Sequence, residues 1–346
     1  MKRIIPAILI IILLMTGCGI TAAKSSSAAA NGDGVKSAAK DPKSEIDLGL
    51  KPNEAGKIMV LMYHNIGEPE AEWVRTPANL RKDLETLYEK GYRPISLSDY
   101  VNGNITTEQG FTPVIITFDD GNLNNFEYTD GGEVKEDSAV GILTDFHDKH
   151  KDFPLKATFF LYGEHPFRQS SLISKKLDFL VENGMDIGNH TKDHNGFKTA
   201  GAEEIQDQIG SEAQYLESVL NKDGYKVDTL ALPFGEGPKG ESLTKYLESG
   251  SSGGVTYENI AILNVGWNPA FSPYDKRFDR TSIPRVRASE MKVDHVGLYD
   301  YLAYFDKHPE EKFISDGQAD VVTVPEGKQT NVQIPDGKEI NLYTSK

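Results

Sequence analysis

The chain has one cysteine, a deficit of positive charge and a single long apolar run, and each shortage excludes a class of protein. Cys18 is the only cysteine among 346 residues, so no disulfide can form within the chain and the hydrophobic core must hold the fold. With 37 basic and 52 acidic residues, the formal net charge is −15. The chain shows no stripe of lysine and arginine, so we do not expect nucleic acid as a partner.

The apolar run extends from Ile4 to Met15, directly after Lys2 and Arg3. It is too short to span a bilayer as a stable helix, and the pattern is typical of a signal peptide. The run ends in "MTGC", which resembles a bacterial lipoprotein processing site with methionine in place of the usual leucine. The resemblance implies removal of residues 1–17, lipidation of Cys18 and an exported protein anchored to the cell membrane by acyl chains. A cleaved signal peptide with an unmodified cysteine is the alternative.

Composition divides the rest of the chain into three parts. Residues 18–55 are rich in Ala, Ser, Gly and Lys, with few large apolar side chains, and we expect a flexible tether. Residues 56–310 have the length and apolar content of one large domain. In residues 311–346, short apolar runs are punctuated by Pro and Gly, which predicts a small β appendage.

Apolar runs alternate with amphipathic stretches through residues 56–310, which predicts an α/β fold with a parallel sheet. We expect seven strands, at 58–63, 114–118, 156–162, 185–188, 228–232, 259–265 and 282–287. The first expected helix begins at Thr76 and ends near Gly91. The other expected helices cover residues 138–150, 171–183, 200–221, 241–249 and 297–307. Residues 122–137 are expected to form a loop.

Two adjacent carboxylates, Asp119 and Asp120, follow the strand "VIITF". Neighbouring side chains on a regular strand point to opposite faces, so the two can converge only where the strand breaks, and Gly121 permits such a break. A helix N-cap or an Asx turn is the alternative reading.

A second polar cluster contains His190 and His194, four residues apart in "HTKDH". This spacing lets both imidazoles reach one metal ion, although a solvated loop would show the same pattern. Two histidines and one carboxylate form a recurring set for a divalent metal with open positions, and Asp120 would complete that set.

Several of these side chains follow different predicted strands. His64, the two aspartates, His190, Phe234 and Trp267 each come directly after one. In barrels of alternating strands and helices, the carboxyl ends of the strands form the active-site rim. This shared position predicts one site.

The sequence "GEGPKG" contains Gly235, Gly237 and Gly240 and matches the dinucleotide pattern G-x-G-x-x-G. It follows the fifth strand rather than the first, and Pro238 removes an N–H that should face a pyrophosphate. We therefore expect a glycine-rich connection and no nucleotide.

These segments resemble the polysaccharide deacetylase family, the family-4 carbohydrate esterases. "TFDDG" (117–121) and "HTKDH" (190–194) are similar to its first two motifs, while "ALPFG" (231–235) and "NVGW" (264–267) resemble the third and fourth more loosely. "VLMYHNI" (60–66) and "ATFFL" (157–161) also resemble strands of the family, and the similarity covers roughly residues 57–290.

The resemblance implies a distorted (β/α) barrel, here of seven strands, that removes N-acetyl groups from amino-sugar polymers. Asp120, His190 and His194 would hold a divalent metal, usually zinc, and Asp119 would be the general base. The backbone N–H of Phe234 would stabilise the oxyanion. Trp267 and Phe234 would be platforms for sugar rings or walls for the acetyl methyl group, unless they are simply buried aromatics.

Two family features are missing. The third motif of the family begins with an arginine that orients the base, and this chain has Ala231 there. Arg285 or Arg287 from the last strand would replace it. The family also has a histidine on that strand as general acid, and "SIPRVRASE" contains none. Either Asp119 carries the proton both ways, or His64 or His295 approaches from elsewhere.

The resulting hypothesis is a lipid-anchored, metal-dependent deacetylase. Its partner would be a polymer that contains N-acetylglucosamine, either peptidoglycan or an exopolysaccharide. A weakened or inactive glycan-binding lipoprotein on the same fold is the first alternative. A metal-dependent hydrolase of another amide or ester is the second.

Overall fold

The computed structural model describes residues 41–344. The predicted signal peptide, the lipidation site Cys18 and residues 18–40 of the predicted tether lie outside the described residues. Within residues 41–344, no helix is both long and apolar enough to cross a membrane.

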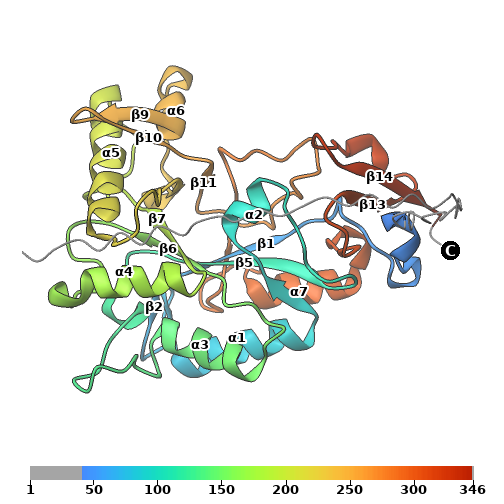
Figure 1. The fold of residues 1–346 in the computed structure, drawn as a ribbon, viewed down its shortest axis with the longest axis horizontal. Coiled ribbons are helices and arrows are strands. Elements are labelled where there is room, and N and C mark those ends of the chain that lie inside the picture. Colours follow the sequence, from blue (N-terminus) through green and yellow to red (C-terminus); the bar gives the residue numbers. More distant parts are fainter. Residues whose placement is uncertain (1–40, 345–346) are drawn as a thin grey trace, which may run out of the picture. The chain divides into compact units, whose positions relative to one another are not determined.

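All seven predicted strands form, and they make one parallel sheet in the order β11-β8-β7-β6-β5-β1-β12. Figure 1 labels β1, β5, β6, β7 and β11 among them. Their bounds are β1 (Met59–Tyr63), β5 (Thr112–Phe118), β6 (Thr158–Leu161), β7 (Asp186–Asn189), β8 (Thr229–Ala231), β11 (Ala261–Leu263) and β12 (Val286–Arg287). An eighth strand that we did not predict, β4 (Tyr92–Pro94), pairs with β5. The prediction of an α/β fold is confirmed.

The sheet curls into a distorted, half-open barrel. Between its two edge strands, β11 and β12, the ladder is reduced to one isolated bridge from Leu263 to Ile283. Arg285, two residues farther along, then lies beside β1, because Val286 is paired with Leu61. The last strand segment therefore lies between the two edges of the sheet and brings its arginines to the barrel interior.

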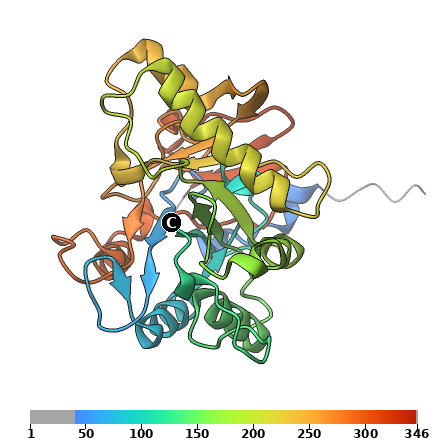
Figure 2. The same ribbon diagram turned by 90° about the vertical axis from the view of Figure 1, so that its left-hand side faces the viewer.

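Helices cover the outside of the curled sheet, with α1 and α3 on one side and α5 on the other (Figure 2). The helices are α1 (Pro77–Glu89), α2 (Leu97–Val101), α3 (Ala139–Lys149), α4 (Ile173–Glu182), α5 (Ala202–Val219), α6 (Glu241–Glu248) and α7 (Leu298–Lys307). Helix α1 begins as predicted, because the Thr76 side chain accepts a hydrogen bond from the Asn79 N–H and Pro77 occupies the first turn.

Short elements account for most of the structure that the sequence did not predict. They are α2, the pair β2 (Asn65–Ile66) and β3 (Val74–Arg75), and the hairpin β9 (Ser249–Ser252) and β10 (Val255–Glu258). Their residues are mostly polar or glycine, so no apolar period marks them. Short 3₁₀ turns occur at η1 (Pro42–Glu45), η2 (Leu48–Leu50), η3 (Leu123–Asn125), η4 (Ser170–Leu172), η5 (Pro233–Gly235), η6 (Pro309–Glu311) and η7 (Gln329–Asn331).

Alternation along the strands divides the core into two clusters. On β1, Leu61 packs with the helices outside the sheet. Val60 points inward and belongs with Ile115 to a second cluster that also contains Phe313 and Val322. Those two residues come from the carboxyl-terminal extension, which forms the parallel pair β13 (Val321–Pro325) and β14 (Glu339–Tyr343).

The extension therefore closes one end of the barrel. The Thr112 hydroxyl, at the start of β5, donates to the Phe313 carbonyl at 2.8 Å. Phe313 lies consequently at the amino ends of the strands, opposite the end where Asp119 follows β5. The predicted appendage exists, and its apolar residues form the floor of the barrel.

The prediction of a flexible tether extends too far toward the carboxyl terminus. The Asn53 N–H donates to the Ile314 carbonyl at 2.8 Å, and Glu54 is buried. The prediction of a tether up to residue 55 is wrong for these residues, because their partners lie in the carboxyl-terminal extension and local composition does not reveal them.

Candidate active site

Asp119 lies at the carboxyl end of β5 and points into the barrel, as Thr117 and Ile115 do before it. The Arg285 guanidinium holds it in a two-pronged ion pair, from Nη1 to Oδ1 and from Nη2 to Oδ2, both at 2.7 Å. Arg285 is itself fully buried, and its Nε donates to the Asn264 carbonyl. Of the two arginines that the sequence left open, Arg285 is therefore the one that contacts Asp119.

Asp120 breaks the strand and turns its carboxylate toward the same end of the barrel. Its φ is 74° and that of Gly121 is 58°, so the reversal begins at the aspartate itself rather than at the glycine. A Cβ on Gly121 would lie 2.8 Å from a methyl carbon of Leu161, which excludes a side chain at this turn. The prediction that the doublet converges at a chain break is confirmed.

His190 and His194 converge on Asp120. Their Nε2 atoms lie 3.6 Å and 3.3 Å from Asp120 Oδ1. That oxygen is buried without a hydrogen-bond partner among the described residues. The ligand atoms of the three residues all lie within 4.8 Å of one another. A buried carboxylate oxygen with two imidazole nitrogens directed at it fits a divalent metal site.

His190 is oriented for metal binding by the backbone. Burial lowers the pKa of His190 to about 4, so its ring is neutral at pH 7. Its Nδ1 lies 2.8 Å from the Ala231 carbonyl and must donate there, which leaves the Nε2 lone pair directed at Asp120. The backbone of Ala231 thus positions a ligand at the place where the family has its arginine.

The two aspartates are both ionised. Burial by itself raises the pKa of Asp119, but Arg285 and the neighbouring imidazoles lower it below its usual range. Burial also raises the pKa of Asp120, and the contact with His194 lowers it. The guanidinium neutralises Asp119, whereas Asp120 faces imidazole nitrogens, an arrangement that suits a cation between them.

His64 lies beside Asp119, with Nε2 3.9 Å from Oδ2. Burial lowers the pKa of His64, and its ring contacts the Trp73 indole with centroids 4.7 Å apart. His295, the other histidine considered as general acid, is exposed on the loop before α7 and lines two other hollows of the surface. The structure thus brings His64 to the site and leaves His295 outside it.

A cavity of about 270 Å³ joins these groups. Its walls are His64, Trp73, Asp119, Asp120, His190, His194, Leu232, Phe234 and Val265. Phe234 has a φ of 59°, and its ring meets the edge of the His194 ring with centroids 4.9 Å apart. The Phe234 side chain is 67% exposed and that of Trp267 is 51% exposed, so neither is the buried aromatic considered as an alternative.

Trp267 does not line the cavity, and Arg287 does not reach Asp119. Arg287 lies between the two tryptophans and pairs with Glu72, Nη1 to Oε1, at 3.2 Å. Arg285, just before β12, and Arg287, within it, are on one face of the extended chain, but Arg287 is one layer nearer the rim. It therefore contacts the loops above the site.

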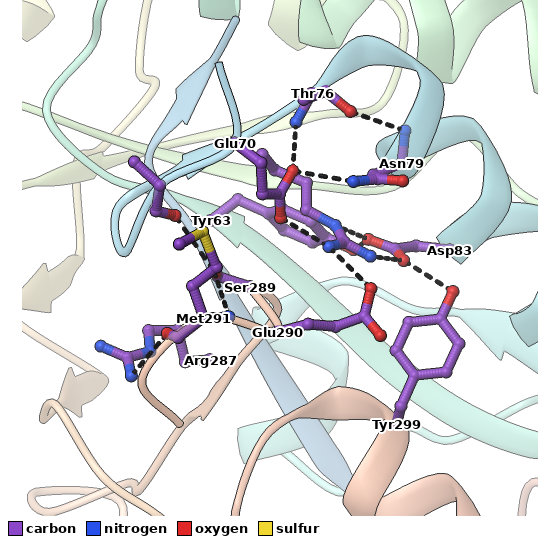
Figure 3. Close-up of polar contacts among 12 residues, drawn as sticks. Tyr63, Glu70, Thr76, Asn79, Asp83, Arg287, Ser289, Glu290, Met291 and Tyr299 are labelled. Atoms are coloured by element: carbon purple, nitrogen blue, oxygen red, sulfur yellow. Dashed lines mark hydrogen bonds and ion pairs between the residues drawn. The ribbon is translucent and has the colours of Figure 1, made fainter. Parts of the chain in front are cut away.

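Two of those loops are tied together by a buried polar network (Figure 3). Arg75 donates to both oxygens of Asp83, at 2.9 and 2.6 Å, and to Glu70 at 2.7 Å. The hydroxyls of Tyr63 and Tyr299 also donate to Asp83, at 3.1 and 2.9 Å. This network fixes the loop between β1 and α1, which carries Trp73, against the segment that leads into α7.

Sequence reasoning missed three contributors to the site. Trp73 occurs in a loop without any motif, and only its contact with His64 reveals it. Tyr162 follows β6, and its ring lies 4.9 Å from that of His194. Gln208, on α5, accepts from the Asp193 N–H at 2.9 Å and donates to the Asp193 carboxylate at 2.6 Å. Tyr162 follows a strand, as the other site residues do, and this position is a signal that could have identified it.

A comparison with known protein families agrees with the family resemblance seen in the sequence. A family model described as polysaccharide deacetylase matches residues 107–249. This segment is therefore similar to that family. It includes Asp119, Asp120, His190 and His194, whereas His64 and Arg285 lie outside it. YxkH of Bacillus subtilis (strain 168), assigned as a polysaccharide deacetylase, is 23% identical over 230 residues, which are 64% of this chain and 73% of YxkH.

Solved structures share the fold of this part of the chain. A Bacillus anthracis protein assigned as a polysaccharide deacetylase has a TM-score of 0.53 at 18% identity, over 71% of this chain and 68% of its own. The Streptococcus pyogenes deacetylase PplD, solved in complex with acetate, has a TM-score of 0.52 at 18% identity, over 71% of this chain and 97% of its own. These likenesses agree with the strand order and with the curl of the sheet.

Proposed function

We propose that this protein is a metal-dependent hydrolase that removes N-acetyl groups from a polysaccharide containing N-acetylglucosamine. One observation carries the proposal. A carboxylate held ionised by a buried arginine lies in the same cavity as a carboxylate and two histidines directed at one point. This combination would supply a base and a metal site within one cavity, as hydrolysis of an acetamide requires.

Asp120, His190 and His194 would hold the metal, for which we propose zinc because two imidazoles and a carboxylate suit it. When bound, a divalent metal supplies Lewis acidity toward the acetyl carbonyl and makes water more acidic. The orphaned Asp120 Oδ1 and the Nε2 atoms of the two histidines are the atoms that would bind it.

The remaining groups move the proton. Asp119 takes a proton from water as the water oxygen attacks the acetyl carbon, and the Phe234 N–H faces the developing oxyanion. The C–N bond then breaks, acetate leaves, and the sugar nitrogen gains a proton to become an amine. His64, beside Asp119, would deliver that proton, and Asp119 itself is the alternative donor.

We also propose that the protein is exported and lipid-anchored at Cys18. The support is the sequence alone, namely the basic start, the short apolar run and the small residues before the cysteine. Metabolic labelling with a fatty-acid analogue would test it, because labelling should be lost on Cys18→Ser. For a protein anchored at the cell surface in this way, the substrate would be peptidoglycan or an exopolysaccharide.

Acetate release is the direct test of the activity. The full chain, loaded with zinc, is incubated with N-acetylglucosamine oligomers, poly-N-acetylglucosamine and peptidoglycan. We expect release from at least one of them, its loss on chelation with EDTA, and a fall of at least about 10²-fold in Asp119→Asn. No release from any of the three would refute the deacetylase.

Glycan retention separates the alternatives. If the protein retains a glycan but the wild type releases no acetate, the binding-protein alternative holds instead. If it hydrolyses other acetamides or esters without competition from N-acetylglucosamine oligomers, the reaction is right and the substrate class is wrong.

A further inference from the structure

Two tryptophans are present in the whole chain, Trp73 and Trp267, and both contact one buried arginine near the cavity. The Arg287 Cζ atom lies 4.8 Å from the centre of the Trp73 ring and 6.0 Å from that of Trp267. The tryptophan side chains are 40% and 51% exposed. Large apolar side chains left half in water beside a cavity indicate a ligand surface.

Arg287 is not itself available to a ligand. It is 3% exposed, pairs with Glu72 and donates through Nη2 to the carbonyls of Met291 and Lys292. Its charge is thus paired and its two terminal nitrogens are engaged by the loops, while its buried Nε has no hydrogen-bond partner among the described residues. Its remaining contribution is a flat guanidinium that packs against the Trp73 ring and fixes the position of the indole.

The loop that carries Trp73 is held independently of any substrate. Ala71 accepts a hydrogen bond from the Ser289 hydroxyl at 3.1 Å, and Arg75 joins Glu70 to Glu290 within the network of Figure 3. Because this wall exists before substrate arrives, a ligand that packs on it does not have to order the loop first.

We propose that Trp73 and Trp267 form a subsite for a pyranose ring of the polymer, next to the sugar whose acetyl group enters the cavity, and that Arg287 is the positioning residue of this subsite. The inference rests on the proposed function. One face of a pyranose presents C–H groups, which pack on the electron-rich face of an indole. Trp73 also touches His64, so a sugar on this wall lies beside the reacting groups.

Kinetics with oligomers of increasing length test the proposal. We expect Trp73→Ala to raise KM for the N-acetylglucosamine tetramer about tenfold, with Trp73→Phe intermediate. A monomeric acetamide, which has no second ring, should show a smaller rise in KM than the tetramer. Arg287→Lys should follow Trp73→Ala, because an ammonium cannot pack flat against the indole.

Arg277→Lys is the matched control. Arg277 also packs on an aromatic ring, with Cζ 4.2 Å from the centre of Phe271, and it pairs with Asp275. It lines no part of the cavity. Its replacement should leave KM unchanged for every oligomer.

Fluorescence gives a readout that does not depend on activity. In the double variant Asp119→Asn, Trp267→Phe, all tryptophan emission comes from Trp73. Titration with the tetramer should change that emission until it saturates, with the same Kd as calorimetry gives.

Two results would overturn this inference alone. They are calorimetric binding without a change in emission, and an unchanged KM in Trp73→Ala. A wild type that neither binds oligomers nor releases acetate overturns the proposed function, and the inference falls with it.

Discussion

Asp119 and Asp120 are neighbours in sequence, yet their surroundings give them different chemistry. Asp119 has both oxygens engaged by Arg285, whereas Asp120 keeps one buried oxygen without a partner among the described residues. The first therefore suits the role of base that we propose for it, because its orientation is fixed. The second suits the proposed role of metal ligand, because one of its oxygens is free to bind an ion.

Replacing Arg285 by lysine should lower kcat/KM for acetate release by about 10²-fold. Lysine keeps the positive charge but cannot form the two-pronged pair, so Asp119 loses its fixed orientation. Acetate assays together with zinc content would check this, since the metal set does not include Arg285 and should still load. Arg280→Lys, at an exposed pair with Glu248, is the control. Equal rates in Arg285→Lys and the control would contradict the assigned role.

His64→Ala should separate proton delivery from the other steps. Loss of a general acid costs about 10²- to 10⁴-fold when the leaving group is an amine. The 4-nitrophenolate group of a 4-nitrophenyl ester leaves without gaining a proton, so hydrolysis of this ester should be nearly unaffected. Steady-state kinetics on both substrates gives the comparison, and a parallel loss on amide and ester would assign the proton delivery to Asp119 instead.

At the scale of elements, helix α5 supports the loop that carries the metal ligands. Gln208 accepts from the Lys192 N–H through its carbonyl, and its side chain holds Asp193. One turn farther, the buried Glu212 accepts from the Gly163 N–H at 3.1 Å. These contacts join α5 to the loops after β6 and β7, and both loops contribute to the site.

Glu212 should make stability depend on pH. Burial raises the pKa of Glu212 to about 9, so the folded protein keeps a proton that the unfolded chain loses above about pH 4.5. The free energy of unfolding therefore falls as the pH rises toward 9, by up to about 1.4 kcal/mol per pH unit.

Glu212→Gln removes this titration and should flatten the decline. Urea denaturation at pH 5, 7 and 9 would measure it. The control is Glu204→Gln, at an exposed position on the same helix. Profiles of identical slope in wild type and Glu212→Gln would show that Glu212 ionises normally in the folded protein.

The sequence predicted the elements that have an apolar period and missed those that lack one. The seven strands and the long helices followed from alternation and from the cap at Thr76. Strand β4 is only three residues long, β9 consists of serine and glycine alone, and β10 has only four residues, so tertiary contacts rather than pattern create them.

The same limit applies to the site. Adjacent motifs predicted the metal set, but a strand pattern places Arg285 and Arg287 on one face and cannot choose between them. The register of β12 against β1 makes the choice. Trp73 had no pattern at all, because its role depends on a contact with His64 across two elements.

On the scale of the whole molecule, the carboxyl-terminal extension belongs to the core. Phe313 is fully buried and shares a cluster with Val60 and Ile115 inside the barrel. Glu54 accepts from the Thr323 N–H at 3.1 Å, which ties the start of the folded region to β13. Figure 1 shows the first described residues in blue beside β13 and β14.

Phe313→Ala should lower the free energy of unfolding by about 3–5 kcal/mol, the usual cost of a large cavity in a core. Urea denaturation would measure the change. Leu342→Ala, at a side chain on β14 that is 43% exposed, should change stability by less than about 0.5 kcal/mol. A loss below about 1 kcal/mol for Phe313→Ala would mean that the extension does not support the barrel.

Because residues after Lys312 supply the floor of the barrel, the order of synthesis matters. A ribosome releases the strands with both site aspartates and both histidines long before it releases Phe313. Until then the apolar interior around Val60 has no cover, and such surfaces are what chaperones and proteases bind. A product interrupted before Phe313 would therefore carry all the aspartates and histidines of the site but lack the residues that cover the interior around Val60.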